Sequence, residues 1–499
     1  MKKQEKMTFG KESGFIFALV GSAIGFANIL SFSAQCYKNG GGAFLVPFLV
    51  AIIIIGVPML YLEGLIGKKY ALPIVSAYAQ VLPHKYKAFG WLAALTCLTI
   101  GSFYTVLTSW SALYAYFAAT NQIPSDTAHF FVHDFLRDSG SLNIFNGISI
   151  PIFGTTVALA FLTWWIMTRH ISKGVEKMCA LFMPLLFVLF AIFAIIVVFL
   201  PGSSIGFYHY LNPRWSKLAD FHLWRDVFGH VFFSFSLGIG IIVAYSRHTK
   251  KETNIRKAML YVALGDLIFS AVAGFAIFGC VGFMSHQTGT PFHEIVTSDS
   301  TFQMGFIIFP QIIQVFSPWL QPIVGALFFF SVFIAGITGV FSIVESVAGN
   351  IEIEFRTTRK SSMTITIIIM LAMSSFFCMG NGVHILGALQ PMVLGYAFLT
   401  GGLAQIFTFM IIDKTIKHDN LWYKINKKPR LSYYCAKYFA IVFLGLNLLG
   451  GLYEEAVAPW TTSHTLRWGW FALVVVFAIV ASRKREMAAQ NIILKNINF

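Results

Sequence analysis

Long apolar stretches dominate the chain, and short polar segments separate them. A helix that crosses a membrane needs about 20 mostly apolar residues. The pattern therefore predicts an all-α membrane protein with 12 transmembrane helices, which form a single transmembrane domain over residues 1–499. The first stretch lacks a small-residue cleavage pattern, so we expect a retained span rather than a signal peptide. The predicted spans lie near 13–37, 42–67, 89–120, 151–168, 178–200, 227–246, 258–284, 319–350, 362–379, 385–412, 432–453 and 468–482.

The composition supports this interpretation. Hydrophobic residues make up 57% of the chain, charged residues only 11%, and the mean hydropathy is +0.71. A soluble domain usually carries about 25% charged residues, so soluble, disordered and collagen-like proteins are excluded. The net charge of +15 is typical of a nucleic-acid binder, but a chain with 52 phenylalanines does not fit that class. We expect a lipid bilayer around the protein and no nucleic-acid partner.

The positions of the basic residues indicate how the chain is inserted. Of the 36 Lys and Arg residues, 30 lie in one alternating set of segments that includes both termini, and 6 lie in the other set. Cytoplasmic loops are enriched in Lys and Arg. We therefore expect a multi-pass protein with both termini in the cytoplasm, which agrees with an even number of spans.

The sequence contains no set of residues typical of an enzyme or a metal centre. The six cysteines are scattered, and no two of them form a CxxC pair. The single His-Glu pair, His293-Glu294, lacks the second histidine of a zinc motif. We expect the cysteines to be small core hydrophobes and the protein not to be an enzyme.

Three acidic residues stand within predicted spans, namely Glu63, Asp266 and Glu345. An ionisable group inside a membrane costs several kcal/mol, so each one is a candidate functional residue. The alternative is that each acid is a structural hydrogen-bond partner for broken helix backbone.

Glycine-rich segments interrupt the first, sixth and eighth spans, at 21–28, 233–240 and 335–339. Glycines weaken a helix, although they also pack helices together in lipid. The first and sixth spans hold equivalent positions in two sets of five. Paired interruptions of this kind indicate a transporter site between inverted repeats. We therefore predict broken helices 1 and 6, a first repeat over 13–200, an inverted second repeat over 227–412, and two further spans over 432–482.

The motifs of the first two spans resemble the signature of the neurotransmitter:sodium symporters, which have the LeuT-type fold. Residues 14–28 read GFIFALVGSAIGFAN and residues 37–44 read YKNGGGAF, with GVP at 56–58 and Glu63 after them. Shorter matches are SW at 109–110, SLG at 236–238, AGF at 273–275 and AGIT at 335–338. The resemblance covers roughly residues 9–480 and is weaker from span 9 onward.

The resemblance implies two sodium sites built from oxygen ligands, which hard cations prefer. The first comprises the Ala23 carbonyl with Asn28, Ser234 and Asp266, together with the substrate carboxylate. The second comprises the carbonyls of Gly21, Ile24 and Ala335 with the Thr338 hydroxyl. Gly339 stands where the family usually supplies one more oxygen, so either one or two sodium ions move per cycle. Ser270 holds the chloride-linked position, and Asp266 replaces a frequent Asn, from which we expect chloride-independent transport.

The substrate site follows from the same resemblance. Tyr104 matches the tyrosine that binds the substrate carboxylate, and Gly25 stands where monoamine carriers have an aspartate. The site therefore favours an amino acid with a neutral, apolar or aromatic side chain. The absence of a side chain at Gly339 and the presence of Ile239 favour a large substrate, whereas Ala27 in place of glycine opposes it. The implied lining residues are Ser22, Ala23, Gly25, Phe26, Ala27, Ile100, Tyr104, Phe233, Ser236, Ile239, Gly339 and Ile343.

The gates depart from the family pattern. Phe233 matches the aromatic lid over the substrate. The charged pair of the outer gate is replaced by Ser31 and Gln390, which favours an outward-open state. The Arg and Trp of the inner gate correspond to Lys6 and Phe9, and their acidic partner corresponds to Ile353, flanked by Glu352 and Glu354.

Together these features predict a sodium-coupled symporter that imports a neutral amino acid by alternating access in a plasma membrane, the inner membrane of a bacterium. The alternative is a receptor-like or uncoupled relative that binds an amino acid, because the second sodium site and the outer gate are degenerate. The sequence does not give the oligomeric state.

Overall fold

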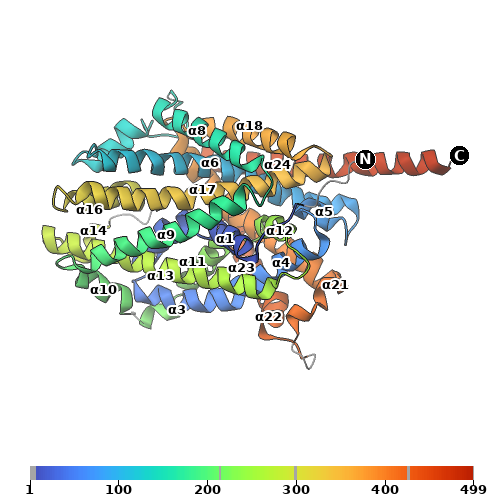
Figure 1. Ribbon diagram of the computed structural model, residues 1–499, viewed down its shortest axis with the longest axis horizontal. Coiled ribbons are helices and arrows are strands. Elements are labelled where there is room, and N and C mark those ends of the chain that lie inside the picture. The colour runs from blue at the N-terminus through green and yellow to red at the C-terminus, as the bar shows by residue number, and fades with distance from the viewer. Residues whose placement is uncertain (1–6, 146, 213–214, 297–300, 424–427, 498–499) are drawn as a thin grey trace.

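Long helices that run roughly side by side make up the computed structural model, which describes residues 7–145, 147–212, 215–296, 301–423 and 428–497, with side chains up to residue 483 (Figure 1). Among the described residues no β-strand occurs, and ten helices are long and apolar enough to cross a membrane. They span Gly42–Tyr70 (α3–α4), His84–Ala119 (mostly α6), Ile150–Met167 (α8), Val175–Val198 (α9), Ile255–Thr288 (α13), Gln321–Glu354 (α17), Arg359–Phe377 (α18), Gly382–Ile412 (α19–η8), Leu431–Val457 (α22–α23) and Thr462–Arg483 (in α24, Thr462–Ile497).

The first predicted span is broken. Helix α1 (Glu12–Ala23) and the segment Ala27–Lys38 (η1 and α2) meet at an angle of 54°, and together they pass as an eleventh span. Ile24 leaves the helical region at φ −83° and ψ 109°. A Cβ atom on Gly25 would lie 2.2 Å from the Tyr104 hydroxyl, so a larger residue at this break would displace the Tyr104 side chain of α6.

The sixth predicted span is also broken, into α11 (Phe221–Ser234) and α12 (Ile241–Ser246). Between the two halves, Ser236, Gly238 and Gly240 have φ angles of 52°, 86° and 80°, which end a right-handed helix. The Glu63 carboxylate of α4 accepts a hydrogen bond of 2.7 Å from the Gly238 N–H. The described residues thus hold ten candidate spans, or eleven with the broken first span, which agrees with an all-α membrane protein, while the number of twelve stays a prediction.

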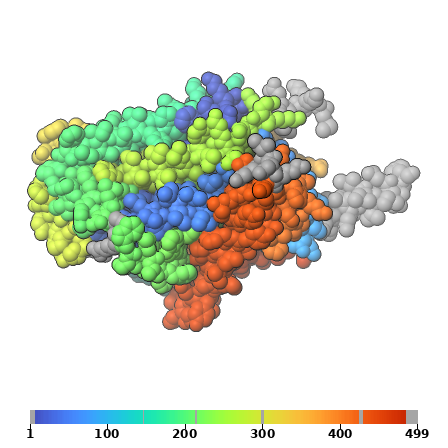
Figure 2. Space-filling view, turned by 90° about the horizontal axis from the view of Figure 1, so that it is seen from below, coloured from blue at the N-terminus to red at the C-terminus, as the bar shows by residue number. Residues whose placement is uncertain are grey.

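Helices α6 and α17 form the centre of the molecule and pack against each other, while α1 and α12 pack against α17. The apolar windows of α6 and α17 are 89% and 83% buried, against 17% for the window in α24. The C-terminal spans therefore lie at the periphery. Figure 2 shows the first of them, around α22–α23 in orange-red, on the outside of the molecule beside the blue second span.

The two ends of the helix array differ. One end carries α10 (Ser203–Leu211), α14 (Phe292–Ile295) and α16 (Phe309–Gln314), and we call it the α10 end (Figure 1). The other end carries α5 (Ile74–Tyr78), α21 (Lys414–Lys417) and α22 (Leu431–Tyr434), and we call it the α5 end.

Candidate functional site

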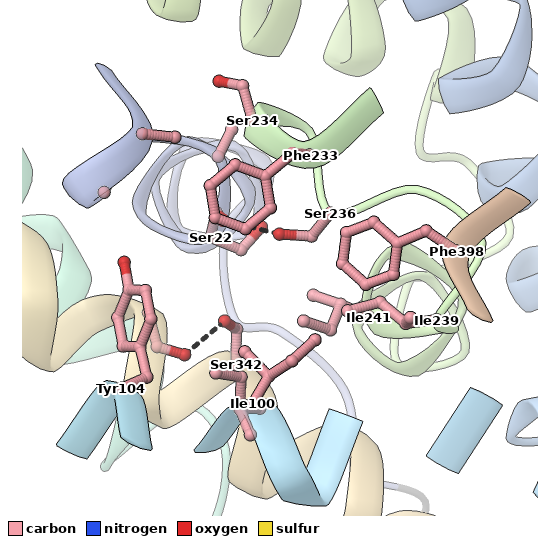
Figure 3. Close-up of a pocket in the computed structure, with 15 residues that line it drawn as sticks. Ser22, Ile100, Tyr104, Phe233, Ser234, Ser236, Ile239, Ile241, Ser342 and Phe398 are labelled. Atoms are coloured by element: carbon pink, nitrogen blue, oxygen red, sulfur yellow. Dashed lines mark hydrogen bonds between the residues drawn. The ribbon is translucent and has the colours of Figure 1, made fainter. Parts of the chain in front are cut away.

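A small cavity lies where the two broken spans face α6 and α17 (Figure 3). Its volume is about 30 Å³, and none of its lining residues is charged. The lining residues are Ser22, Ala23, Gly25, Ala27, Ile100, Tyr104, Phe233, Ser234, Ser236, Ile239, Ile241, Gly339, Ser342, Ile343 and Phe398.

The cavity includes eleven of the twelve residues that the sequence placed around the substrate. The exception is Phe26, which lines a larger space on the α10 side and packs its ring against Tyr104 at 4.8 Å between centroids. Ile241, Ser342 and Phe398 were not predicted as lining residues. Ser342 stands one helical turn after Thr338 and Gly339, so the helical period could have indicated it. Phe398 comes from α20 (Ala397–Gln405), and no local pattern indicates its place against Phe233 at 6.1 Å.

The Tyr104 side chain fills the space beside Gly25 and Gly339. Its hydroxyl accepts a hydrogen bond of 3.3 Å from the Phe26 backbone N–H, so its own hydrogen remains available to a ligand. A Cβ atom on Gly339 would lie 2.8 Å from the Tyr104 ring. The prediction that Gly339 enlarges the substrate site is therefore wrong, because Tyr104 occupies that room.

The predicted first sodium site is a buried cluster of oxygens and one amide. The Asn28 amide group lies 2.6 Å from Asp266 Oδ1, 2.9 Å from Ser270 Oγ and 3.1 Å from Ser234 Oγ. Ser234 also donates to Asp266 Oδ1 at 2.6 Å. Asp266 Oδ2 is buried without a hydrogen-bond partner. An orphaned carboxylate oxygen beside the Ser234 and Ser270 hydroxyls supplies the kind of ligand that a hard cation prefers, although the Asn28 amide presents its NH₂ group to the cluster.

Three of the four residues of the predicted second site, namely Gly21, Ala335 and Thr338, also lie together. A Cβ atom on Gly21 would lie 3.2 Å from the Thr338 Cβ and 3.3 Å from the Met183 sulfur. The Thr338 hydroxyl lies 3.0 Å and 3.1 Å from the Ile334 and Ala335 carbonyl oxygens of its own helix. The site therefore offers carbonyl and hydroxyl oxygens but no anionic group.

A vestibule of about 530 Å³ lies on the α10 side of the cavity. Ser31 and Gln390, the predicted outer gate, both line it, and Phe233 and Tyr104 line the vestibule and the cavity alike. The charged residues of its wall are paired with other elements. Arg225 contacts Glu454 at 2.7 Å, and Asp226 contacts Lys38 at 3.4 Å.

Toward the α5 end, ionic contacts close the molecule around Glu345. Its carboxylate is fully buried and lies 2.8 Å from Arg359 and 3.1 Å from Arg247. Phe9 is buried, and its N–H donates to the His248 carbonyl at 3.0 Å. Burial, and then the Arg247 guanidinium, lower the pKa of His248.

The predicted inner gate differs from this arrangement. Lys6 lies outside the described residues. Ile353 is 38% exposed, Glu352 lies 3.7 Å from Arg247, and Glu354 pairs instead with Lys87 at 3.0 Å. Arg247, His248 and Arg359 were not predicted, because the sequence showed only an excess of basic residues in their loops.

Glu63 has the role that the structural alternative describes, since it accepts from Gly238 within broken span 6. Its second oxygen is buried without a partner. Asp266, in contrast, faces the buried cluster with Asn28 and Ser234, and Glu345 pairs with basic residues toward the α5 end.

Comparisons with known proteins show the family of this chain. The profile of the Sodium:neurotransmitter symporter family matches residues 6–138 and 118–482. An uncharacterized sodium-dependent transporter of the archaeon Methanocaldococcus jannaschii is 31% identical over 84% of this chain and 85% of its own length. The sodium- and chloride-dependent GABA transporter 2 of Rattus norvegicus is 25% identical over 95% of this chain and 85% of its own, and the Homo sapiens protein of that name is 25% identical over 96% and 86%. The chain is thus a transporter rather than an enzyme, and it belongs to the sodium:neurotransmitter symporter family.

Proposed function

We propose that this protein imports a neutral amino acid with an apolar or aromatic side chain, together with sodium. The observation that supports this proposal is that a buried cluster of oxygen atoms adjoins an uncharged, mostly apolar cavity. The Asp266 cluster offers oxygens for a cation, and the adjoining cavity offers the Tyr104 hydroxyl and apolar walls from Ile100, Ile239 and Ile343. An uncharged lining provides no counter-charge for an acidic or basic side chain.

A carboxylate beside the cation site gives a physical basis for coupling. Each cargo lowers the free energy of binding of the other, and this effect is reciprocal. A zwitterionic amino acid moves no net charge, whereas each sodium ion gains about 2.3 kcal/mol per 100 mV. One sodium ion therefore supports roughly 50-fold accumulation at that voltage, using about 1.4 kcal/mol per decade.

Alternating access accounts for the two different ends. The vestibule connects the α10 side to the cavity, and the Glu345 cluster closes the α5 side. We assign the α10 end to the outside and the α5 end, with both termini, to the cytoplasm, because the Lys- and Arg-rich segments belong to the α5 end. The membrane is then a plasma membrane, the inner membrane if the source is bacterial.

Chloride independence is a separate part of the proposal. Asp266 places a carboxyl group 2.6 Å from Asn28, which also contacts Ser270, the position where the resemblance implies a chloride-linked group. The GABA transporters among the relatives are named as chloride-dependent. We propose that this chain does not depend on chloride, because the Asp266 carboxylate takes the place of the chloride ion.

Transport by the purified protein in liposomes tests these points. We expect an inward sodium gradient to drive accumulation of one or a few labelled amino acids among the twenty, also after gluconate replaces chloride. Loss of uptake without chloride would contradict chloride independence. Sodium-dependent binding without accumulation would favour the receptor-like alternative, which Gly339 and the uncharged pair Ser31 and Gln390 support.

A further inference from the structure

We infer that the side-chain amide of Asn28 couples the two cargoes by reversing which of its ends faces the Asp266 cluster. The inference rests on the proposed function, and it concerns how sodium and the amino acid assist each other's binding. Asn28 lies in η1 (Ala27–Ser31), directly after the break of span 1, and it is fully buried. Its two ends therefore contact two different parts of the site.

The hydrogen-bond partners fix the orientation of this amide. The NH₂ end donates to Asp266, Ser234 and Ser270, and the Oδ1 end accepts from the Gly25 N–H at 2.9 Å. The reversed amide would place a donor against the Gly25 N–H and an oxygen against the Asp266 carboxylate. The network thus determines the assignment, as it must for an amide whose two ends look alike.

A cation requires the opposite orientation. Sodium is bound by oxygen, and an NH₂ group pointing at it would be repelled. For Asn28 to act as a ligand beside Asp266 and Ser234, Oδ1 has to turn toward the cluster. The Gly25 N–H then loses its acceptor, and a buried N–H without a partner is costly. Sodium binding alone therefore leaves an unsatisfied backbone donor.

A carboxylate in the cavity removes this cost. Gly25 and Tyr104 both line the cavity, and the Phe26 N–H makes only a long contact of 3.3 Å with the Tyr104 hydroxyl. A substrate carboxylate can accept from these backbone donors. By linkage, a carboxylate that takes over the Gly25 N–H also frees Asn28 Oδ1 for the cation. Through the Asn28 amide, binding of sodium favours binding of the amino acid and the reverse. This effect adds to the direct attraction between the sodium ion and the substrate carboxylate.

Hydrogen exchange of the purified full-length chain tests the reversal with sodium as the only ligand. We expect the Gly25 amide to exchange faster in sodium than in potassium or choline, because it loses its acceptor. Adding L-leucine or L-tryptophan with sodium should then slow its exchange. Slower or unchanged exchange at Gly25 in sodium alone would overturn the inference, and this measurement needs no variant.

The variant Asn28→Asp separates coupling from ligation. A carboxylate has two oxygens, so one can accept from Gly25 while the other faces the cation, and no reversal is needed. We expect the variant to retain binding of ²²Na⁺. The factor by which sodium tightens binding of L-leucine or L-tryptophan, typically about 5- to 150-fold for coupled sites, should fall several-fold. A variant that keeps the full factor, or that loses sodium binding itself, would show that Asn28 is only a ligand.

Asn350→Asp is the matched control. Asn350 is also buried, its oxygen accepts from the Val75 N–H at 3.0 Å, and its NH₂ donates to the Ser346 carbonyl at 2.8 Å, but it lies in the cytoplasmic half of α17. We expect the sodium factor of this control to match the wild type. If the wild-type protein itself shows no sodium effect on any of the twenty amino acids, the proposed function fails, while the exchange measurement still decides whether the amide reverses.

Discussion

At the scale of single residues, the Tyr104 hydroxyl is the polar group best placed to hold a carboxylate. It lines both the cavity and the vestibule. We predict that Tyr104→Phe weakens amino-acid binding by about 10- to 150-fold, because a hydrogen bond to a charged group contributes about 1.5–3 kcal/mol. Equilibrium binding measures the effect, and sodium binding without substrate should change little. Tyr114→Phe is the control, since Tyr114 lies on the same helix, is buried and donates to the Phe306 carbonyl instead. Equal effects of the two variants would remove Tyr104 from the substrate site.

Asp266 acts at the same scale, through its charge. Its carboxylate accepts from Ser234 and Asn28, and one oxygen has no partner. We predict that Asp266→Asn raises the sodium concentration needed for half-maximal uptake by at least about tenfold, which corresponds to 1.4 kcal/mol. Chloride should now stimulate uptake, because the variant lacks the negative charge beside Ser270. Asp138→Asn, in a loop at the α10 end, should have neither effect. Unaltered sodium dependence in Asp266→Asn would contradict the assigned cation site.

At the scale of elements, Glu63 holds the broken sixth span. We predict that Glu63→Gln is tolerated, because the amide oxygen can still accept from the Gly238 N–H. Glu63→Leu should lower the free energy of unfolding by about 1–3 kcal/mol, the cost of an unsatisfied buried donor. Thermal unfolding in detergent, followed together with uptake, distinguishes the two variants. A leucine variant as stable as the glutamine variant would show that the carboxylate contributes little to the break.

The elements also show which features of the fold and the site the sequence predicts. Apolar length predicts the spans because the bilayer core has a fixed thickness, and glycine clusters predict the breaks because φ angles such as that of Gly238 suit glycine. The family resemblance then predicted most of the residues that line the cavity. Phe398 and Arg247 could not be predicted in this way, because each meets its partners through tertiary packing between distant segments. The room beside Gly339 was misjudged for the same reason, since Tyr104 comes from another helix.

At the scale of the whole molecule, the vestibule lacks the charged pair that the family resemblance leads one to expect. We predict that Ser31→Arg combined with Gln390→Asp slows labelling of a cysteine placed at Gln35 in the vestibule wall. A partly exposed ion pair contributes about 0.2–1 kcal/mol, so the labelling rate should fall by up to about fivefold. Ser31→Arg alone, which adds a cation without its partner, is the control. An unchanged rate in the double variant would mean that these positions do not meet when the vestibule closes.

At the α5 end, closure depends on a few buried charged residues around Glu345. Removing one partner from a buried ion pair costs about 3–5 kcal/mol, because the remaining charge stays unpaired. Glu345→Gln removes the carboxylate partner of Arg359 and leaves Arg247 only its longer ionic contact with Glu352 at 3.7 Å, so the closed α5 end should lose stability relative to an open one. Cys179 is buried beside Tyr245 near this cluster and serves as a native reporter. We predict that its labelling rate rises at least about tenfold in Glu345→Gln, measured by peptide mass spectrometry, whereas the control Glu352→Gln changes it little.

If Cys179 stays protected, the packing of Phe9 and α1, rather than the ionic cluster, keeps this end closed. If it becomes accessible, the Glu345 cluster sets the resting direction of the transporter, because Ser31 and Gln390 in the vestibule form no ion pair that would resist opening there.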